Sequence, residues 1–169
     1  GPPLSLAAVW GAAVPIVVDI GFGDGLATAA LAREEPYGVL AIDVHTPGIG
    51  ELIARLQESE TTNVRIIEGD ALAVLSSRIE PASLAGVRTW FPDPWPKARH
   101  HKRRIVQPAV LDLVHSRLGE RGWWHIATDW AEYAESIVAV FAADHVVQKV
   151  EAFQALCVKA AEAAAKGHI

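Results

Sequence analysis

The residues best suited to chemistry lie in one short stretch, Phe91–Arg104, where an acidic side chain precedes a dense basic run. Asp93 stands between Pro92 and Pro94, whose rings restrict the backbone that presents its carboxylate. A carboxylate in a fixed position can accept the adjacent N1–H and amino donors of a guanine base. Asp93 is therefore a candidate for holding a base, and the alternative is an aspartate that only shapes a turn.

The basic run after Asp93 concentrates positive charge in an acidic chain. Five of the 15 Lys and Arg residues fall in it, although the formal net charge of the chain is -5. They are Lys97, Arg99, Lys102, Arg103 and Arg104. Clustering of this kind favours phosphate binding with a steep salt dependence, and the alternative is a solvated basic loop. Trp95 within the stretch either stacks on a splayed base or is buried behind the loop.

A second candidate site is the glycine loop, defined as Asp19-Ile-Gly-Phe-Gly-Asp-Gly25. Glycines between a strand and a helix let the backbone approach a ligand closely. Leu26 stands where a dinucleotide fingerprint requires glycine, so the spacing disfavours a nicotinamide cofactor. An acidic residue two positions before G-x-G-x-G is instead typical of S-adenosylmethionine-dependent methyltransferases.

Two further acids end predicted strands. Asp43 follows the second strand, where a carboxylate can accept both ribose hydroxyls of a nucleoside; the alternative is a cap or a solvated loop acid. Asp70 follows the third strand and either contacts an adenine amino group or caps the helix that begins at Ala71. Asp19 is expected near the charged amino-acid end of the cofactor. Together with the glycines, these acids favour S-adenosylmethionine.

The elements that must position these residues alternate between strand and helix. Strands are predicted at 14–20, 39–43, 64–68, 84–91 and 122–128, and helices at 26–33, 49–59, 71–79, 108–118 and 130–142. The alternation predicts an α/β fold with a doubly wound, mostly parallel sheet and ligands at the carboxyl ends of its strands. Asp129 and Glu132 form a capping-box pattern at the last of these helices. The alanine-rich segment 151–166 predicts one more helix.

Length and composition limit the class of protein. A chain of 169 residues predicts a single domain, 1–169. The one cysteine, Cys157, fits a reducing cytosol, and the scattered histidines lack metal-ligand spacing, so we expect no metal. The apolar segment 6–18 is too short to span a bilayer and lacks a signal peptide's basic start, so we expect a cytoplasmic protein without a membrane partner. The absence of methionine and the glycine at position 1 indicate that the sequence is not a complete translation product.

Four motifs together resemble those of the bacterial tRNA (guanine-N7)-methyltransferases, and the resemblance extends over residues 17–140. The motifs are the glycine loop, Ile42-Asp-Val-His-Thr-Pro-Gly-Ile-Gly50, the stretch 91–106 and Ala127-Thr-Asp-Trp-Ala-Glu-Tyr-Ala134. The resemblance implies a Rossmann-like class I S-adenosylmethionine-dependent methyltransferase fold. It also implies methyl transfer from S-adenosyl-L-methionine to N7 of a guanosine in tRNA, at position 46 of the variable loop, with S-adenosyl-L-homocysteine as the second product.

The same resemblance implies roles for individual residues. Asp93 would be the catalytic residue. The cofactor site would contain Asp19, Gly21, Gly23, Gly25, Asp43, Asp70 and Asp93. The tRNA would contact Lys97, Arg99, His100, His101, Lys102, Arg103, Arg104 and Asp129. A monomer or a homodimer is expected.

The sequence departs from the family's pattern in three places. It has neither the family's Thr-x-Phe-Glu motif nor its basic N-terminal extension, and Asp19 and Asp43 stand where the family often has Glu. If the two segments are absent from the molecule, we expect cofactor binding to survive while tRNA modification is impaired.

Two other functions compete with tRNA modification. One is an S-adenosylmethionine-dependent methyltransferase with another substrate. The other is a non-catalytic RNA-binding module on the same fold. The four acids at the strand ends argue against the module, because RNA binding alone would not need them.

Overall fold

The structure is a computed structural model that describes residues 2–11 and 13–143, and the chain divides into two compact units. The first unit comprises Gly1–Thr89 and Leu113–His125, and the second comprises Trp90–Asp112 and Ile126–Ile169. The helix predicted at 151–166 and the residue Cys157 lie outside the described residues. The single domain expected from the length of the chain stays a prediction.

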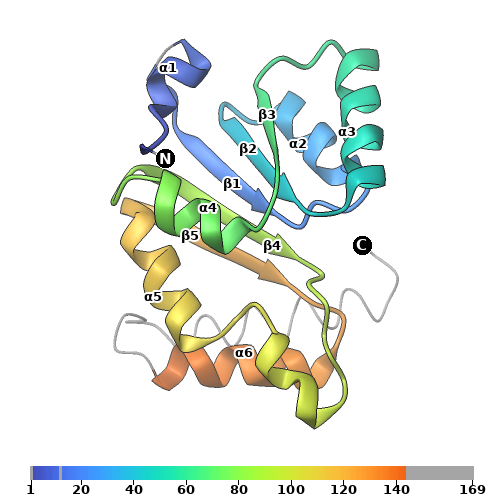
Figure 1. The fold of residues 1–169 in the computed structure, drawn as a ribbon, viewed down its shortest axis with the longest axis vertical. Helices are drawn as coiled ribbons and strands as arrows, with labels where there is room; N and C mark the ends of the chain where they lie inside the picture. The colour runs from blue at the N-terminus through green and yellow to red at the C-terminus, as the bar shows by residue number, and fades with distance from the viewer. Residues whose placement is uncertain (1, 12, 144–169) are drawn as a thin grey trace. The chain divides into compact units, whose positions relative to one another are not determined.

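The first unit is built on a sheet of parallel strands (Figure 1). The strands are β1 (Ile16–Ile20), β2 (Gly38–Asp43), β3 (Val64–Glu68), β4 (Leu84–Trp90) and β5 (Leu118–Ala127), in the order β3-β2-β1-β4-β5. β1 pairs in parallel with β2 and with β4, and β2 pairs in parallel with β3. Every residue of β1 is buried, as expected for a central strand covered on both faces. The predicted doubly wound α/β sheet is confirmed.

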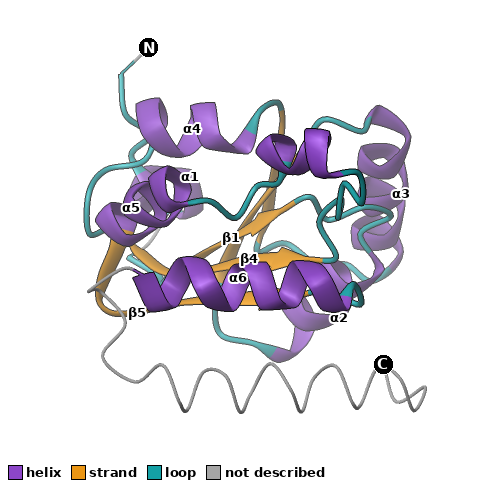
Figure 2. Cartoon of the chain, turned by 90° about the horizontal axis from the view of Figure 1, so that it is seen from below, coloured by secondary structure: helices purple, strands orange, loops and turns teal. Residues whose placement is uncertain are grey.

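α1 (Leu6–Trp10) precedes the first strand, and helices form the connections between the strands. The connecting helices are α2 (Leu26–Glu34), α3 (Thr46–Glu58), α4 (Ala71–Arg78) and α5 (Pro108–Arg117), which passes from the second unit into the first. α2 and α3 pack on β2 and β3 around Leu52, which is completely buried with Ala32 and Val39. Figure 2 shows α2 and α4 on opposite sides of β1 and β4. Helices therefore cover both faces of the sheet.

The second unit carries Asp93 and the basic run. Residues 92–96 form an irregular segment, followed by a 3-10 helix η1 (Ala98–Arg103) and, after β5, by α6 (Ala131–Ala143). α6 buries Tyr133, Ile137 and Phe141, which recur every four residues and so lie on one face of the helix. The described helices include none that is both long and apolar enough to cross a membrane.

The element boundaries differ from the prediction mainly at α3 and β5. α3 begins at Thr46 rather than at residue 49, because the His45 ring accepts a hydrogen bond from Gly48 N at 3.3 Å and Pro47 is tolerated in the first turn. β5 begins at Leu118 rather than at residue 122. Gly119, in the extended part of the strand, lies where an added Cβ would be 3.5 Å from the Leu84 carbonyl oxygen of the neighbouring strand.

Gly25 provides a test of how α2 begins. Its φ is 73°, and an added Cβ would lie 2.6 Å from the Cβ of the buried Leu52. We expect Gly25→Ala to lower the free energy of unfolding by about 2–4 kcal/mol, because left-handed strain adds to overlap in the core.

The matched control is Gly21→Ala. Gly21 has a similar φ of 70°, but an added Cβ would meet no atom within 4 Å. In this variant only the left-handed strain should lower the free energy of unfolding, by about 1–2 kcal/mol. Urea denaturation measures both variants, and equal losses would show that Leu52 relaxes without cost.

Candidate functional site

The glycine loop joins β1 to α2 through backbone in the left-handed region. Gly21, Gly23 and Gly25 have φ values of 70°, 60° and 73°, which glycine adopts without strain. Gly21 N donates to the carbonyl oxygen of Ile42 in β2 at 2.9 Å, so the loop is fixed to the neighbouring strand. Space beside Gly21 and Gly23 is open, since an added Cβ at either would meet nothing within 4 Å. The loop can therefore admit a ligand against its backbone.

Asp43 connects the end of β2 to the glycine loop. One carboxylate oxygen accepts from Gly23 N at 3.0 Å, and the other accepts from His45 N at 3.0 Å. A carboxylate offers about four acceptor positions, so each oxygen can still accept a hydroxyl from a ligand. Asp43 lies at the carboxyl end of its strand as predicted. Its contact with Gly23 was not predicted.

Asp19 is buried inside β1, with 2% of its surface exposed. Its Oδ2 accepts the hydroxyl of Thr28 in α2 at 2.7 Å. Burial raises the pKa of Asp19 above its ordinary value, and the bond from Thr28 and the positive charge of Arg88 oppose that rise. Thr28 was not predicted as a site residue. The available signal was its spacing of four residues from the buried Ala32, which places both on the covered face of α2.

Asp70 caps α4. Its Oδ1 accepts from Leu72 N at 2.8 Å and from Ala73 N at 3.2 Å, so one of the two alternatives left open by the sequence is realised. The cap uses only one of the two carboxylate oxygens. Contact of the other oxygen with a cofactor stays a prediction.

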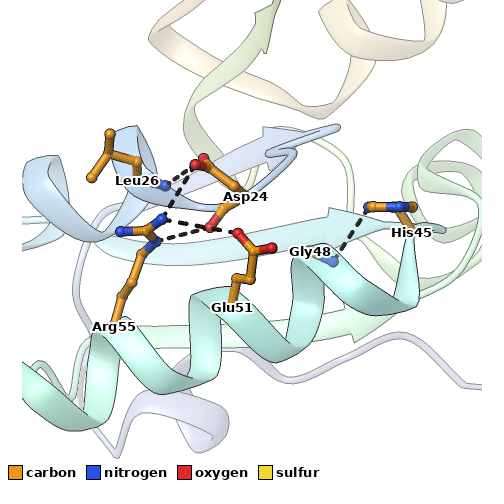
Figure 3. Close-up of polar contacts among 6 residues, drawn as sticks. All are labelled: Asp24, Leu26, His45, Gly48, Glu51 and Arg55. Atoms are coloured by element: carbon orange, nitrogen blue, oxygen red, sulfur yellow. Dashed lines mark hydrogen bonds and ion pairs between the residues drawn. The ribbon is translucent and has the colours of Figure 1, made fainter.

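Arg55 of α3 holds the end of the glycine loop (Figure 3). Its Nε donates to the Asp24 carbonyl oxygen at 3.1 Å, and its Nη2 donates to the Asp24 carboxylate at 3.3 Å. The other Asp24 oxygen accepts from Leu26 N, the first residue of α2, at 3.0 Å. Gly48 allows α3 this close approach, because a Cβ there would lie 2.0 Å from the Gly23 carbonyl oxygen. Neither Arg55 nor Gly48 was predicted, since no local pattern links them to the loop.

In the second unit, Asp93 lies on a strained, exposed loop. Phe91 and Trp95, two residues before and after it, have φ values of 50° and 44°, which large side chains rarely adopt. Phe91 N donates to the Ala127 carbonyl oxygen at 2.8 Å and fixes the start of the loop. Among the described residues the Asp93 carboxylate has no hydrogen-bonding or ionic partner, so it can accept from a ligand.

Trp95 lies two residues before the first cation of the basic run and is half-buried. The guanidinium of Arg103 lies 4.9 Å from the centre of its ring, and the His100 ring meets it edge-on at 5.9 Å. Lys97, Arg99, Lys102 and Arg103 are exposed, as phosphate contacts must be.

Arg104, for which the resemblance implies a tRNA contact, is buried, unlike the other cations of the run. Only 4% of its surface is exposed, and its Nε donates to the Pro94 carbonyl oxygen at 2.8 Å. Its two terminal nitrogens pair with the two carboxylate oxygens of Glu132, and its guanidinium lies 4.6 Å from the centre of the Tyr133 ring. All three nitrogens are therefore engaged inside the protein. Glu132, expected in a capping box, has its carboxylate on Arg104, whose hydrogen bonds lower the pKa of that carboxyl.

Asp129 is exposed two residues before the first residue of α6. The backbone turn there is closed by Thr128, whose hydroxyl oxygen accepts from Trp130 N at 3.2 Å. A contact between Asp129 and substrate stays a prediction. Within residues 2–11 and 13–143, no three His, Cys, Asp or Glu side chains gather as a metal ion would require.

Comparison with known sequences identifies related proteins. Residues 13–166 match the model of a family described as putative methyltransferase. The chain is 49% identical over 145 residues to the tRNA (guanine-N(7)-)-methyltransferase of Mycolicibacterium paratuberculosis. The matched region covers 85% of this chain and 56% of that protein. The chain is 47% identical over 145 residues to the protein of the same name from Nitrosospira multiformis, covering 85% and 63% respectively. The chain thus spans less than two thirds of the length of these curated relatives.

Comparison with solved structures agrees with the observed sheet. A putative methyltransferase from Streptococcus mutans, solved in complex with SAH, superposes with a TM-score of 0.56 at 20% identity, covering 80% of this chain and 74% of that one. At this identity the likeness shows the fold alone. The fold is the Rossmann-like one predicted from the sequence.

The raised pKa of Asp19 predicts a pH-dependent stability. Because its folded pKa lies above its unfolded value, the native protein binds the proton more readily, so stability rises as the pH falls through the folded pKa. Above that pKa the buried charge is fully unfavourable. Asp19→Asn keeps an acceptor for Thr28 without the charge, so its melting temperature relative to the parent should be highest at pH 7 and should fall toward pH 4.

Melting curves of both ligand-free proteins across this range measure the difference. Thr28→Val is a second variant: loss of its hydroxyl should raise the Asp19 pKa further and steepen the dependence. A difference between the Asp19→Asn variant and the parent that does not change with pH would contradict the shifted pKa.

Proposed function

We propose, because the chain belongs to the putative methyltransferase family, that it transfers a methyl group from S-adenosyl-L-methionine to N7 of a guanosine in tRNA. The observation that carries the proposal is its similarity to the two curated tRNA (guanine-N(7)-)-methyltransferases. Position 46 of the variable loop and a cytoplasmic location belong to the same proposal. Since the chain spans only part of those relatives, the activity proposed is that of the whole protein to which this sequence belongs.

The residues of the first unit fit S-adenosylmethionine. Gly21 and Gly23 leave open space beside the backbone, and Asp43 retains acceptor positions for two ribose hydroxyls. Asp70 has one carboxylate oxygen outside its helix cap for an amino group. The buried Asp19 is proposed to supply negative charge behind the glycine loop, toward the ammonium end of the cofactor. When bound, this cofactor supplies an electrophilic methyl group to the guanine N7 lone pair, leaving S-adenosylhomocysteine.

Asp93 is proposed to hold the guanosine. Its carboxylate has no partner among the described residues, and it can accept the N1–H and the amino group of guanine together. Guanine N7 carries a lone pair and no proton, so Asp93 needs no role as a base. Positive charge develops on the ring during transfer, and a fixed carboxylate stabilises it electrostatically. Orientation of N7 toward the methyl group provides most of the remaining rate enhancement.

The tRNA backbone is proposed to contact the exposed cations of the basic run. These are Lys97, Arg99, Lys102 and Arg103, with the half-buried His100 and His101 among them. Each phosphate neutralised on duplex RNA should contribute about -0.9 to the slope of log affinity against log salt, as it does for duplex DNA. Asp129 is proposed as a further substrate contact.

Transfer of labelled methyl groups to bulk tRNA tests the substrate directly. Digestion of the product to nucleosides should place the label in 7-methylguanosine. Label in another nucleoside, or binding of the cofactor without transfer to tRNA, would favour a methyltransferase with a different substrate.

Asp43 provides a test of the cofactor assignment. Asp43→Asn should weaken S-adenosylmethionine binding by about 1–3 kcal/mol. The amide nitrogen, unlike the carboxylate oxygen that it replaces, cannot accept a hydrogen bond from a ribose hydroxyl or from a backbone N–H of the loop. Calorimetry on the parent and the variant measures the loss, with the exposed Asp112→Asn as the control. Equal affinities of parent and variant would remove Asp43 from the site, and tight NAD binding by the parent would overturn the cofactor itself.

Asp93 provides a test of the reaction. Asp93→Asn should slow methyl transfer at saturating tRNA by about 10²- to 10³-fold while S-adenosylmethionine affinity changes much less, because a carboxylate oxygen becomes a donor and the negative charge is lost. Single-turnover rates with equilibrium binding of the cofactor separate the two effects. Transfer at the parental rate would show that Asp93 only shapes the turn.

A further inference from the structure

The cations from Arg99 to Arg104 are not equivalent, because the 3-10 helix, which ends at Arg103 with Arg104 as its C-cap, directs them to different sides. A 3-10 helix has three residues per turn, so residues three apart lie on the same side. His100 and Arg103 form one such pair, and both contact the Trp95 ring. His101 and Arg104 form another, and both approach the Glu132 carboxylate, His101 at 3.9 Å. Arg99 and Lys102 form the third pair and are exposed.

The pair that includes Arg104 is directed into the second unit. The Arg104 side chain is 3% exposed, whereas its partner Glu132 is 52% exposed. Arg104 lies against Tyr133, which is completely buried and whose hydroxyl accepts from Val106 N at 3.1 Å. The guanidinium thus contacts the Pro94 carbonyl oxygen and two side chains of α6, those of Glu132 and Tyr133. A phosphate could reach it only by displacing Glu132.

The remaining bond of Arg104 runs to the loop that carries Asp93. Its Nε donates to the carbonyl oxygen of Pro94, the residue directly after Asp93. Phe91 N, on the other side of Asp93, is held by the Ala127 carbonyl oxygen. One of these bonds lies on each side of Asp93. Through its pairing with Glu132, Arg104 also links the loop to α6.

The loop needs such an anchor because its backbone is strained. Phe91 and Trp95 both hold left-handed φ values, a conformation that persists in large residues only where the surrounding structure enforces it. Pro94 immediately precedes Trp95, so a bond to its carbonyl oxygen restricts the peptide plane that sets the Trp95 conformation. Arg104 is the described side chain that donates to this oxygen.

We infer that Arg104 is a positioning residue: paired with Glu132, it holds the Asp93 loop in its strained conformation, and the phosphate contacts of the basic run end at Arg103. The inference rests on the proposed function for its effect on catalysis. Its effect on the loop is independent of any substrate. The arrangement explains why a cation in a proposed tRNA-binding segment is buried.

The test compares Arg104→Gln with Lys102→Gln, which removes one positive charge from the exposed side of the same helix. Arg104→Gln should leave the salt slope of tRNA binding at its parental value, and Lys102→Gln should reduce the slope by about 0.9. At saturating tRNA, single-turnover methyl transfer by Arg104→Gln should fall by about 10- to 100-fold, since small misplacements of a reacting group have effects of that size.

The loop itself is observed by fluorine NMR of protein labelled with 5-fluorotryptophan. The chain has six tryptophans, and the Trp95 resonance is assigned with Trp95→Phe. Arg104→Gln should shift or broaden the Trp95 resonance while the other five keep their positions. Lys102→Gln should leave all six unchanged. General destabilisation would instead alter the other tryptophans as well.

Glu132→Gln is the second variant, and it decides the matter if Arg104→Gln does not fold. It weakens the pairing from an exposed position, so the Trp95 resonance should move in the same direction by a smaller amount. A parental Trp95 resonance in both variants would overturn the inference, as would a salt slope reduced by about 0.9 in Arg104→Gln. If the parent transfers no methyl group to tRNA, the proposed function fails, and the Trp95 resonance still decides whether Arg104 positions the loop.

Discussion

The first unit depends on the hydrogen bonds between the Asp43 carboxylate and the backbone around it. A parallel sheet ends its strands at one edge, but the loops beyond that edge have no intrinsic position. Asp43 joins the Gly23 amide to the start of α3, and Gly21 N bonds to β2 in the same region. The loop is thereby fixed before any ligand binds. Pre-formed geometry of this kind lowers the ordering cost of binding.

An arginine side chain fixes a loop in each of the two units, and the two ion pairs differ in how strongly water screens them. Arg55 reaches the carbonyl oxygen and the carboxylate of Asp24, and Arg104 reaches the Pro94 carbonyl oxygen and the Glu132 carboxylate. The Arg55 side chain is 35% exposed, so its ion pair is screened by water and contributes little on its own. The Arg104 side chain is buried, so loss of its partner would leave a charge without compensation. Removal of one partner should therefore cost more at the Arg104–Glu132 pair than at the Arg55–Asp24 pair.

Sequence patterns predicted what depends on neighbouring residues. The alternation of elements gave the sheet, and the glycine spacing gave a loop whose three glycines have positive φ. Asp43 was placed at the end of its strand because strand ends can be read from local composition. The local pattern at Glu132 was misleading: a capping box was predicted, and the tertiary contact with Arg104, 28 residues away, prevailed. Gly48 and Arg55 were missed for the same reason, since their partners in the glycine loop are distant in the sequence.

The basic run shows why composition alone does not assign a role to a charge. Lys97, Arg99, Lys102, Arg103 and Arg104 are equivalent in the sequence as positive charges without acidic neighbours. The 3-10 helix places Arg99 and Lys102 on an exposed side and Arg103 on Trp95, and Arg104 at its end lies on Glu132. An α-helix would have distributed the same residues differently, with 3.6 per turn. The short length of the helix is typical of the tighter form, and so the backbone of this segment decides which cation is buried.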